Sequence, residues 1–260
     1  MIRALACAAL LMAAAPARAG PPACPVPEEV ALHGLALPHA RDEVATRQRL
    51  DVLVLGSADM LGRAAQGDAF SIPARLTARL REALPGVDVH LVTHAAPRRS
   101  ASAALGDLDA DLARTRATLV IWNSGAVEAG RGTDIDDLAD SLQTGIQRIR
   151  AANADIILVN LQYAPSIARI VDLQPYRDAV SRIGGANEVP VLDRYEMMRA
   201  WSESGLLDLD VTEPEARVQV ARQLFDCVAA ALADPILAAL RPPPPSPPPP
   251  EPPPEPPPPP

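Results

Sequence analysis

The stretch VLVLGSADMLG, residues 52–62, has the pattern of a buried strand that runs into a tight turn. Its first four residues are apolar without interruption, as in strands covered on both faces. Gly56 and Ser57 then end the strand, and in many enzymes a turn at this point carries a nucleophile or cradles a phosphate. The residues of this turn therefore show whether the protein has a catalytic site here or only a turn of the same shape without catalytic groups.

Similar apolar runs of strand length recur along the chain, and amphipathic segments separate them. Together with residues 51–56, the runs are residues 87–93, 117–123, 154–160 and 189–193. Leucine or isoleucine recurs on one face of the segments 72–84, 136–152 and 215–232, which predicts helices with an apolar side. This alternation predicts an α/β fold in which a five-stranded parallel sheet carries helices on both faces.

Polar residues directly follow the predicted strands. In parallel sheets ligands bind beyond the carboxyl ends of the strands, so these residues are the candidates for a binding cleft. They are Ser57, Asp59, His94, Asn123, Ser124, Gln162 and Tyr163, with Arg194 and Tyr195 after the last strand.

The first 19 residues have the pattern of a secretory signal peptide. Arg3 precedes an apolar run that is too short to span a bilayer, and Ala17-Arg18-Ala19 fits the rule for cleavage by signal peptidase. We therefore expect residues 1–19 to be removed and the mature protein to be periplasmic or secreted, without a transmembrane segment.

Residues 241–260 hold sixteen of the 30 prolines in the chain. Proline has no backbone N–H, so this segment cannot pair into a sheet or continue a helix, and we expect a disordered polyproline tail. Two interpretations remain open. The tail is a spacer or a ligand for a cell-wall or envelope protein, or it is a dispensable extension.

The charge and the basic residues exclude several function classes. The formal net charge is −8 at pH 7, and removal of Arg3 and Arg18 with the signal peptide lowers it to −10. A surface that binds nucleic-acid phosphates is therefore not expected. All basic residues are arginine, which excludes mechanisms that need a Schiff-base lysine or a P-loop lysine.

Two cysteines remain after the signal peptide is removed, Cys24 and Cys227. In an exported chain, two cysteines suggest one disulfide, which here would join the start of the domain to the last predicted helix. The alternative is two free, buried thiols.

Several motifs together resemble those of the SGNH (GDSL-type) hydrolases. The strand-one turn has the form Gly-Ser-x-x-x-x-Gly, and IPARL then opens a helix. A PG turn precedes the second strand. LVIWNSGAVEA contains the end of the third strand and the residues after it, and LVNLQYAP does the same for the fourth strand. LDVTEP precedes the terminal helix. The likeness covers residues 24–235 and implies a flavodoxin-like three-layer α/β/α fold. It also implies hydrolysis of acyl esters or sugar acetates.

The domains expected are the signal peptide, a hydrolase-like domain over residues 20–240, and the proline-rich tail.

The catalytic positions that the resemblance implies are substituted in this chain. The family nucleophile is a serine two residues after the turn glycine, and Ala58 stands there, with Ser57 one residue too early. The oxyanion positions fall on Ala95 or Ala96, where the family has glycine, and on Val127, where it has asparagine. Methyl and isopropyl groups neither attack an acyl carbon nor donate hydrogen bonds to an oxyanion.

The base of the family is a histidine in an Asp-x-x-His segment, and this segment aligns with Asp210 and Glu213. A glutamate with an ordinary pKa of about 4.3 is a poor base for a serine hydroxyl. New chemistry by Asp59, Glu128, Asp210 and Glu213 would require these carboxylates to converge. No metal or other cofactor is expected, because the sequence has neither a zinc-ligand spacing nor a phosphate loop.

The sequence thus predicts an exported SGNH hydrolase-like protein that has lost ester hydrolysis. In this interpretation it acts as a scaffold or as a module that binds a glycan or an acyl ester. An active carboxylesterase or acetylesterase with a non-standard site, such as one that uses Ser57, is the alternative. A third interpretation is a structural wall protein in which the tail is the working part.

Overall fold

The computed structural model describes residues 24–241. The predicted signal peptide and residues 242–260 of the predicted tail lie outside the described residues. Five strands form one sheet in the order β2-β1-β3-β4-β5, and every neighbouring pair is parallel. The strands are β1 (Arg49–Ser57), β2 (Asp88–Ala96), β3 (Leu119–Asn123), β4 (Asp155–Val159) and β5 (Val191–Leu192). The α/β fold with a five-stranded parallel sheet is therefore confirmed.

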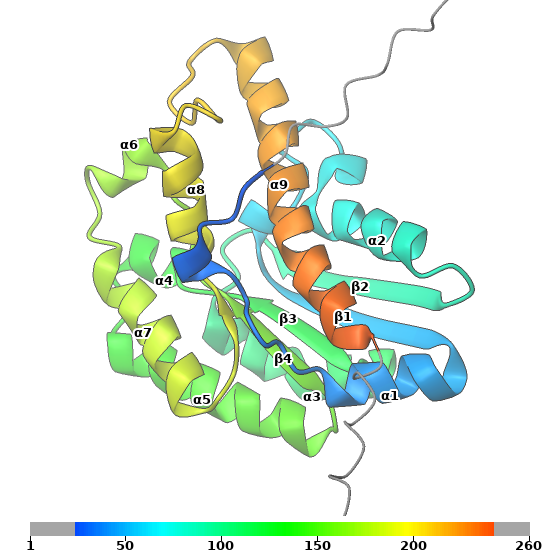
Figure 1. The fold of residues 1–260 in the computed structure, drawn as a ribbon. Helices are drawn as coiled ribbons and strands as arrows, with labels where there is room; N and C mark the ends of the chain where they lie inside the picture. Colours follow the sequence, from blue (N-terminus) through cyan, green and yellow to red (C-terminus); the bar gives the residue numbers. More distant parts are fainter. Residues whose placement is uncertain (1–23, 242–260) are drawn as a thin grey trace, which may run out of the picture.

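Helices cover both faces of the sheet, as Figure 1 shows. One face carries α1 (Pro38–Arg47), α2 (Ile72–Ala83), α8 (Arg194–Glu203) and α9 (Pro214–Leu240). The other face carries α3 (Ala101–Thr115), α4 (Ala126–Arg131), α5 (Ile135–Ala151) and α7 (Gln174–Ala186). The short elements are α6 (Pro165–Ala168) and the 3-10 turns η1 (Glu28–Val30), η2 (Ala58–Met60) and η3 (Asp68–Phe70).

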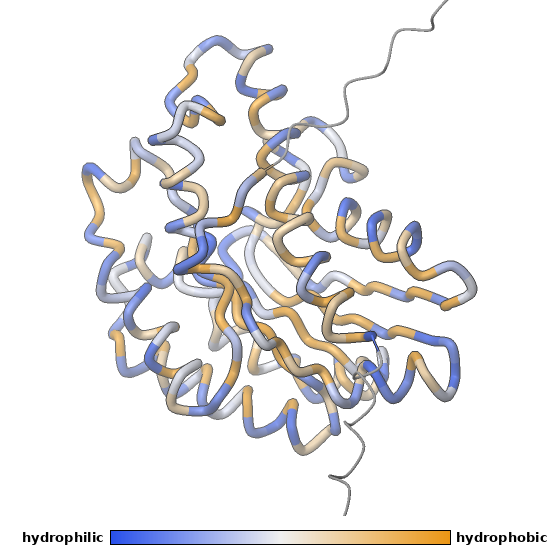
Figure 2. The backbone as a smooth tube through the Cα atoms, in the orientation of Figure 1, coloured by the Kyte–Doolittle hydropathy of each residue, from blue (hydrophilic) through white to orange (hydrophobic). Residues whose placement is uncertain are grey.

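The helices begin where the sequence provides caps. Ser71 accepts a hydrogen bond from the Ala74 N–H at 3.2 Å and starts α2, and Asp134 accepts from the Asp136 N–H at 2.8 Å and starts α5. Such caps satisfy backbone donors that have no partner within the helix. Each helix then packs its apolar side on the sheet, and Figure 2 shows hydrophobic positions concentrated in the central strands.

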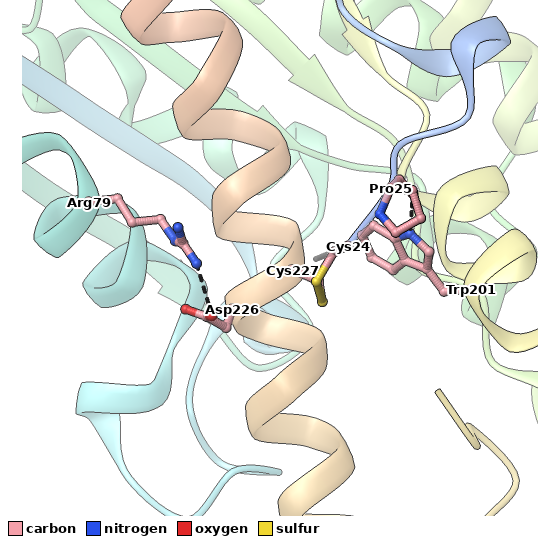
Figure 3. The surroundings of a disulfide bond; sticks show 6 residues. All are labelled: Cys24, Pro25, Arg79, Trp201, Asp226 and Cys227. Atoms are coloured by element: carbon pink, nitrogen blue, oxygen red, sulfur yellow. Dashed lines mark hydrogen bonds and ion pairs between the residues drawn. A yellow bond between two sulfur atoms is a disulfide. The ribbon is translucent and has the colours of Figure 1, made fainter. Parts of the chain in front are cut away.

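A disulfide joins Cys24 to Cys227 across 203 residues of sequence, with their Cα atoms 5.4 Å apart (Figure 3). This is the pair that the sequence singles out. The Trp201 Nε1–H donates to the carbonyl oxygen of Pro25 at 2.7 Å, next to the disulfide. The N-terminal arm is therefore fixed to α9 by a covalent bond and to α8 by a hydrogen bond.

Among the described helices, α9 is long and apolar enough by composition to cross a membrane. However, 56% of its most apolar 18-residue window is buried inside the protein. Buried core helices of soluble proteins share this composition, so the helix alone does not indicate a membrane span.

Candidate functional site

The strand-one turn lies at the carboxyl edge of the sheet, where β1 passes close to the end of β3. A Cβ atom at Gly56 would lie 3.0 Å from the Cβ of Asn123 and 3.2 Å from its carbonyl oxygen, so a side chain at this position would be crowded by the end of β3. Ser57 and Asn123 are both buried, with 7% and 3% of their surface exposed. Both side chains bond to the carboxylate of Asp59, so the turn serine and the amide of Asn123 meet at one acidic group.

Asp59 is the centre of a buried polar cluster in this turn. Its carboxylate accepts a hydrogen bond from the Ser57 hydroxyl, and the Nδ2 of Asn123 lies 3.2 Å from both of its oxygens. The Nη1 of Arg194 forms a salt bridge with Asp59 at 2.6 Å. The Arg194 side chain is fully buried and that of Asp59 is 8% exposed, so this is a desolvated ion pair.

Arg194 also bonds the turn backbone and the end of β4. Its Nη2 donates to the carbonyl oxygen of Asp59 at 3.3 Å and to the Oε1 of Gln162 at 3.4 Å. One guanidinium thus connects the loops after β1 and β4. Of the nine predicted cleft residues, the structure brings five together in this cluster: Ser57, Asp59, Asn123, Gln162 and Arg194.

Arg194 is held in place by the segment that follows β5. The fully buried Asn160 donates from Nδ2 to Asp193 at 2.7 Å and accepts from the Tyr195 N–H at 3.1 Å. Asp193 in turn caps α8 by accepting from the Glu196 N–H at 3.1 Å. Arg194 is the first residue of the helix capped in this way, and its side chain enters the turn of β1.

Three buried polar atoms of the site have no hydrogen-bond partner among the described residues. They are the Oδ1 of Asn123, the Oγ of Ser124 and the Nε of Arg194. Native proteins pair almost all buried polar atoms, so a group of three at one place is unusual. These atoms mark the carboxyl edge of β3 and β5 as a polar position within an apolar core.

His94 lies outside this cluster. Its Nδ1 is bonded to the carboxylate of Asp111 on α3, and Arg99 lies 3.5 Å from the same ring atom. Burial raises the pKa of the Asp111 carboxyl, but hydrogen bonds from His94 and Arg114 outweigh it and hold the pKa below the ordinary value. The structure therefore connects His94 to the helix that covers the sheet, and not to Ser57.

The three other acidic candidates serve the fold or the surface. Glu213 caps α9 by accepting from the N–H groups of Glu215 at 3.1 Å and Ala216 at 2.5 Å. These hydrogen bonds from Ala216 and Glu215 lower the pKa of the Glu213 carboxyl, which makes it a weaker base still. Asp210 is exposed and pairs with Arg169 at 3.3 Å.

Glu128 is buried, and its two oxygens accept from the Ala101 N–H at 2.6 Å and the Gly125 N–H at 3.0 Å. It therefore fixes the beginnings of α3 and α4. Among the described residues, no group of three or more histidine, cysteine, aspartate or glutamate side chains could hold a metal ion.

The positions to which the resemblance assigns the oxyanion groups lie on two elements. Ala95 is in β2 and pairs with Gly56 of β1, and Ala96 pairs with Ser57. Val127 is in the first turn of α4. Neither the alanines nor the valine offers a side-chain donor beside the turn, and Ala58 offers no nucleophile.

A cavity of about 170 Å³ opens at the same edge of the sheet. Gln162 and Tyr163 line it from the end of β4, and Asp208 and Arg217 add charged groups to its wall. Apolar residues make up most of the remaining lining, namely Met198, Leu209, Val211, Val220 and Leu224. Its volume equals that of about six water molecules in the liquid. Tyr163 also packs edge-on against Tyr195, with ring centroids 5.1 Å apart.

A wider depression of about 870 Å³ lies at the opposite, amino-terminal edge, between Arg49, Asp51, Arg116 and Asn153. Its four acidic residues and four arginines largely pair with one another, as in Arg49 with Asp51 and Arg148 with Asp109. Volume alone therefore does not identify the site.

Comparison with solved structures supports the fold. The lipase/acylhydrolase from Enterococcus faecalis superposes with a TM-score of 0.56 at 19% identity, covering 74% of this chain and 98% of that one. A catalytic mutant of Axe2, an acetylxylan esterase from Geobacillus stearothermophilus, gives a TM-score of 0.55 at 14% identity, with 73% and 93% covered. The esterase EstA from Pseudoalteromonas sp. gives 0.52 at 17% identity, with 71% and 100% covered.

Sequence comparison gives the family. None of the curated proteins is significantly similar to this chain. The model of the Non-GDSL lipase-like family, however, matches residues 23–242, which include the whole of the described part. The chain thus has the fold of the SGNH hydrolases and belongs to the Non-GDSL lipase-like family.

Proposed function

We infer that the protein binds a glycan or an acyl ester without hydrolysing it, or serves as a scaffold, in the periplasm or outside the cell. One observation carries this inference: the turn that would hold the nucleophile contains Ala58 and is closed by the buried pair of Asp59 and Arg194. A nucleophile must be free to approach a substrate carbonyl, and here the carboxylate that accepts from the Ser57 hydroxyl is held by a fully buried guanidinium. The Cys24–Cys227 disulfide supports an oxidising compartment.

The cavity beside Gln162 and Tyr163 supports the binding role. Its apolar lining suits an acetyl group or a short acyl chain, and the polar atoms of Gln162 and Tyr163 suit an ester or hydroxyl oxygen. This is also the edge of a parallel sheet at which ligands bind.

An active esterase is the second candidate, because the Ser57 hydroxyl donates to a carboxylate as a nucleophile donates to its base. Two features weigh against it. Asp59 already accepts from Asn123 and Arg194, and Ala95, Ala96 and Val127 offer no side-chain donor for an oxyanion.

Two probes test the binding role on the mature protein, hexanoate for an acyl chain and an acetylated xylo-oligosaccharide for a glycan ester. We expect one of them to bind in calorimetric titration, and we expect Val211→Trp, which fills the cavity, to weaken binding at least tenfold. Val218→Trp is the matched control, because Val218 is also half-buried but lines a separate depression on α9. Absence of binding by both probes, or equal binding by both variants, would contradict a ligand site in this cavity.

A further inference from the structure

The outer edge of the sheet is open along β2. In the described part of the chain, β2 pairs with β1 and with no other strand. The N–H of Asp88 donates to Gln48 at 2.8 Å, on the side of β1, whereas the carbonyl of Val89 accepts from Arg81, at 2.9 Å from Nη2. Because backbone groups alternate in direction along a strand, the odd-numbered residues of β2 point their N–H and C=O groups outward.

Arg81 limits the length of the open edge. It occupies the carbonyl of Val89, which leaves Leu91, Thr93 and Ala95 with outward backbone groups that no described strand pairs. All three are exposed or half-buried. An unpaired edge of this kind accepts a further strand, and natural proteins usually cover it.

A groove runs beside this edge between β2 and α2. It has a volume of about 400 Å³ and is lined by Leu91, Thr93 and Ala95 together with Ser71, Pro73, Ala74 and Thr77 of the α2 segment. An added strand would place alternate side chains in the groove. The proline-rich tail is not suited to this role, because a proline lacks the N–H that strand pairing needs.

We propose that the open edge of β2 pairs with the same edge of a second copy of the chain. The two strands run antiparallel about a two-fold axis at Thr93, so that Thr93 lies opposite Thr93 and Leu91 lies opposite Ala95 of the second copy. The three pairs contain the outward-facing residues of β2 whose carbonyls Arg81 leaves open, and they would form about six backbone hydrogen bonds, two for each pair. The product is one continuous ten-stranded sheet, in which each face of the interface is the same surface.

Charge complementarity favours this register. Antiparallel pairing at Thr93 brings Asp88, at the start of β2, to the end of β2 of the second copy, where Arg98 lies in the turn two residues after the strand, and the symmetry repeats this approach. Both side chains are exposed, and neither belongs to a salt bridge among the described residues. A register centred on Leu91 would instead require the carbonyl of Val89, which Arg81 already holds.

The mass of the mature protein in sedimentation velocity tests the proposal. We expect a concentration-dependent dimer for the wild type and a monomer for Thr93→Pro, which removes an outward N–H from the centre of the edge. Thr93→Val keeps the backbone donor and should remain a dimer. A wild type that stays monomeric up to about 100 µM, a range in which specific protein pairs associate, would overturn the proposal.

A charge-reversal series covers the case in which Thr93→Pro fails to fold. Asp88→Arg or Arg98→Asp alone should weaken the dimer at least tenfold, because each places like charges opposite one another. The double variant Asp88→Arg with Arg98→Asp should restore the wild-type affinity. Equal dimerisation by all four proteins would refute the proposed register, and association of β2 with an extended segment of another protein instead of a second copy would contradict the choice of partner.

Discussion

Replacing Arg194 with alanine is expected to lower the free energy of unfolding by about 3–5 kcal/mol. The substitution leaves the Asp59 carboxylate buried without the guanidinium that compensates its charge. It also removes the hydrogen bonds to the Asp59 carbonyl and to Gln162. Unfolding in urea, followed by circular dichroism, measures the loss.

An exposed arginine on the same helix provides the control. Arg199 pairs with Glu196 and Glu203 on α8, but its side chain is 44% exposed. Solvent screens such pairs, so Arg199→Ala should change the stability by about 0–1 kcal/mol. Replacing both members of the buried pair, in Asp59→Leu with Arg194→Met, should recover part of the loss. A cost for Arg194→Ala no larger than that for Arg199→Ala would show that the buried pair does not hold the turn.

Loss of the disulfide is expected to have an effect of similar size. In the chain-entropy model, a bond that closes a loop of this length contributes about 5 kcal/mol by restricting the unfolded chain. The double variant Cys24→Ala with Cys227→Ala should therefore unfold at a lower urea concentration than the oxidised wild type. The fluorescence of Trp201, which bonds Pro25 beside the disulfide, reports the release of the arm.

Reduction of the wild type is the matched control for the cysteine variants. A reductant should lower the stability of the wild type and leave that of the double variant unchanged. Two thiols that react with an alkylating agent in the folded, exported protein would contradict the presence of the bond.

Much of the fold could be predicted from the sequence because the strands and three helices have regular apolar patterns. The run at 51–56 lies within β1, and the segments 72–84 and 136–152 match α2 and α5 within one residue at each end. The helix α3 was not predicted, because its buried side consists partly of Ala101 and Ala104, which give little periodic signal. The last predicted strand covers residues 189–193, whereas β5 in the structure has only two residues.

The candidate site was predicted only in part. The order of the strands brings Ser57, Asp59, Asn123 and Gln162 to one edge, as the rule for parallel sheets implies. The sequence places Arg194 at that edge too, but the residues around it in the sequence do not indicate that it pairs with Asp59, 135 residues away. His94 was expected in the cleft because it follows the predicted strand 87–93, but β2 extends to Ala96, and alternation along the strand directs the His94 side chain to Asp111 on α3.

The central claim is that the strand-one turn contains no working nucleophile. Its most direct test is the intact mass of the mature wild-type protein after incubation with an excess of a serine-directed aryl phosphonate. We predict no change in mass, because Ala58 cannot react and the Ser57 hydroxyl is bonded to a carboxylate that Arg194 holds. A stoichiometric phosphonate adduct that disappears in Ser57→Ala would contradict this account and would identify an active esterase.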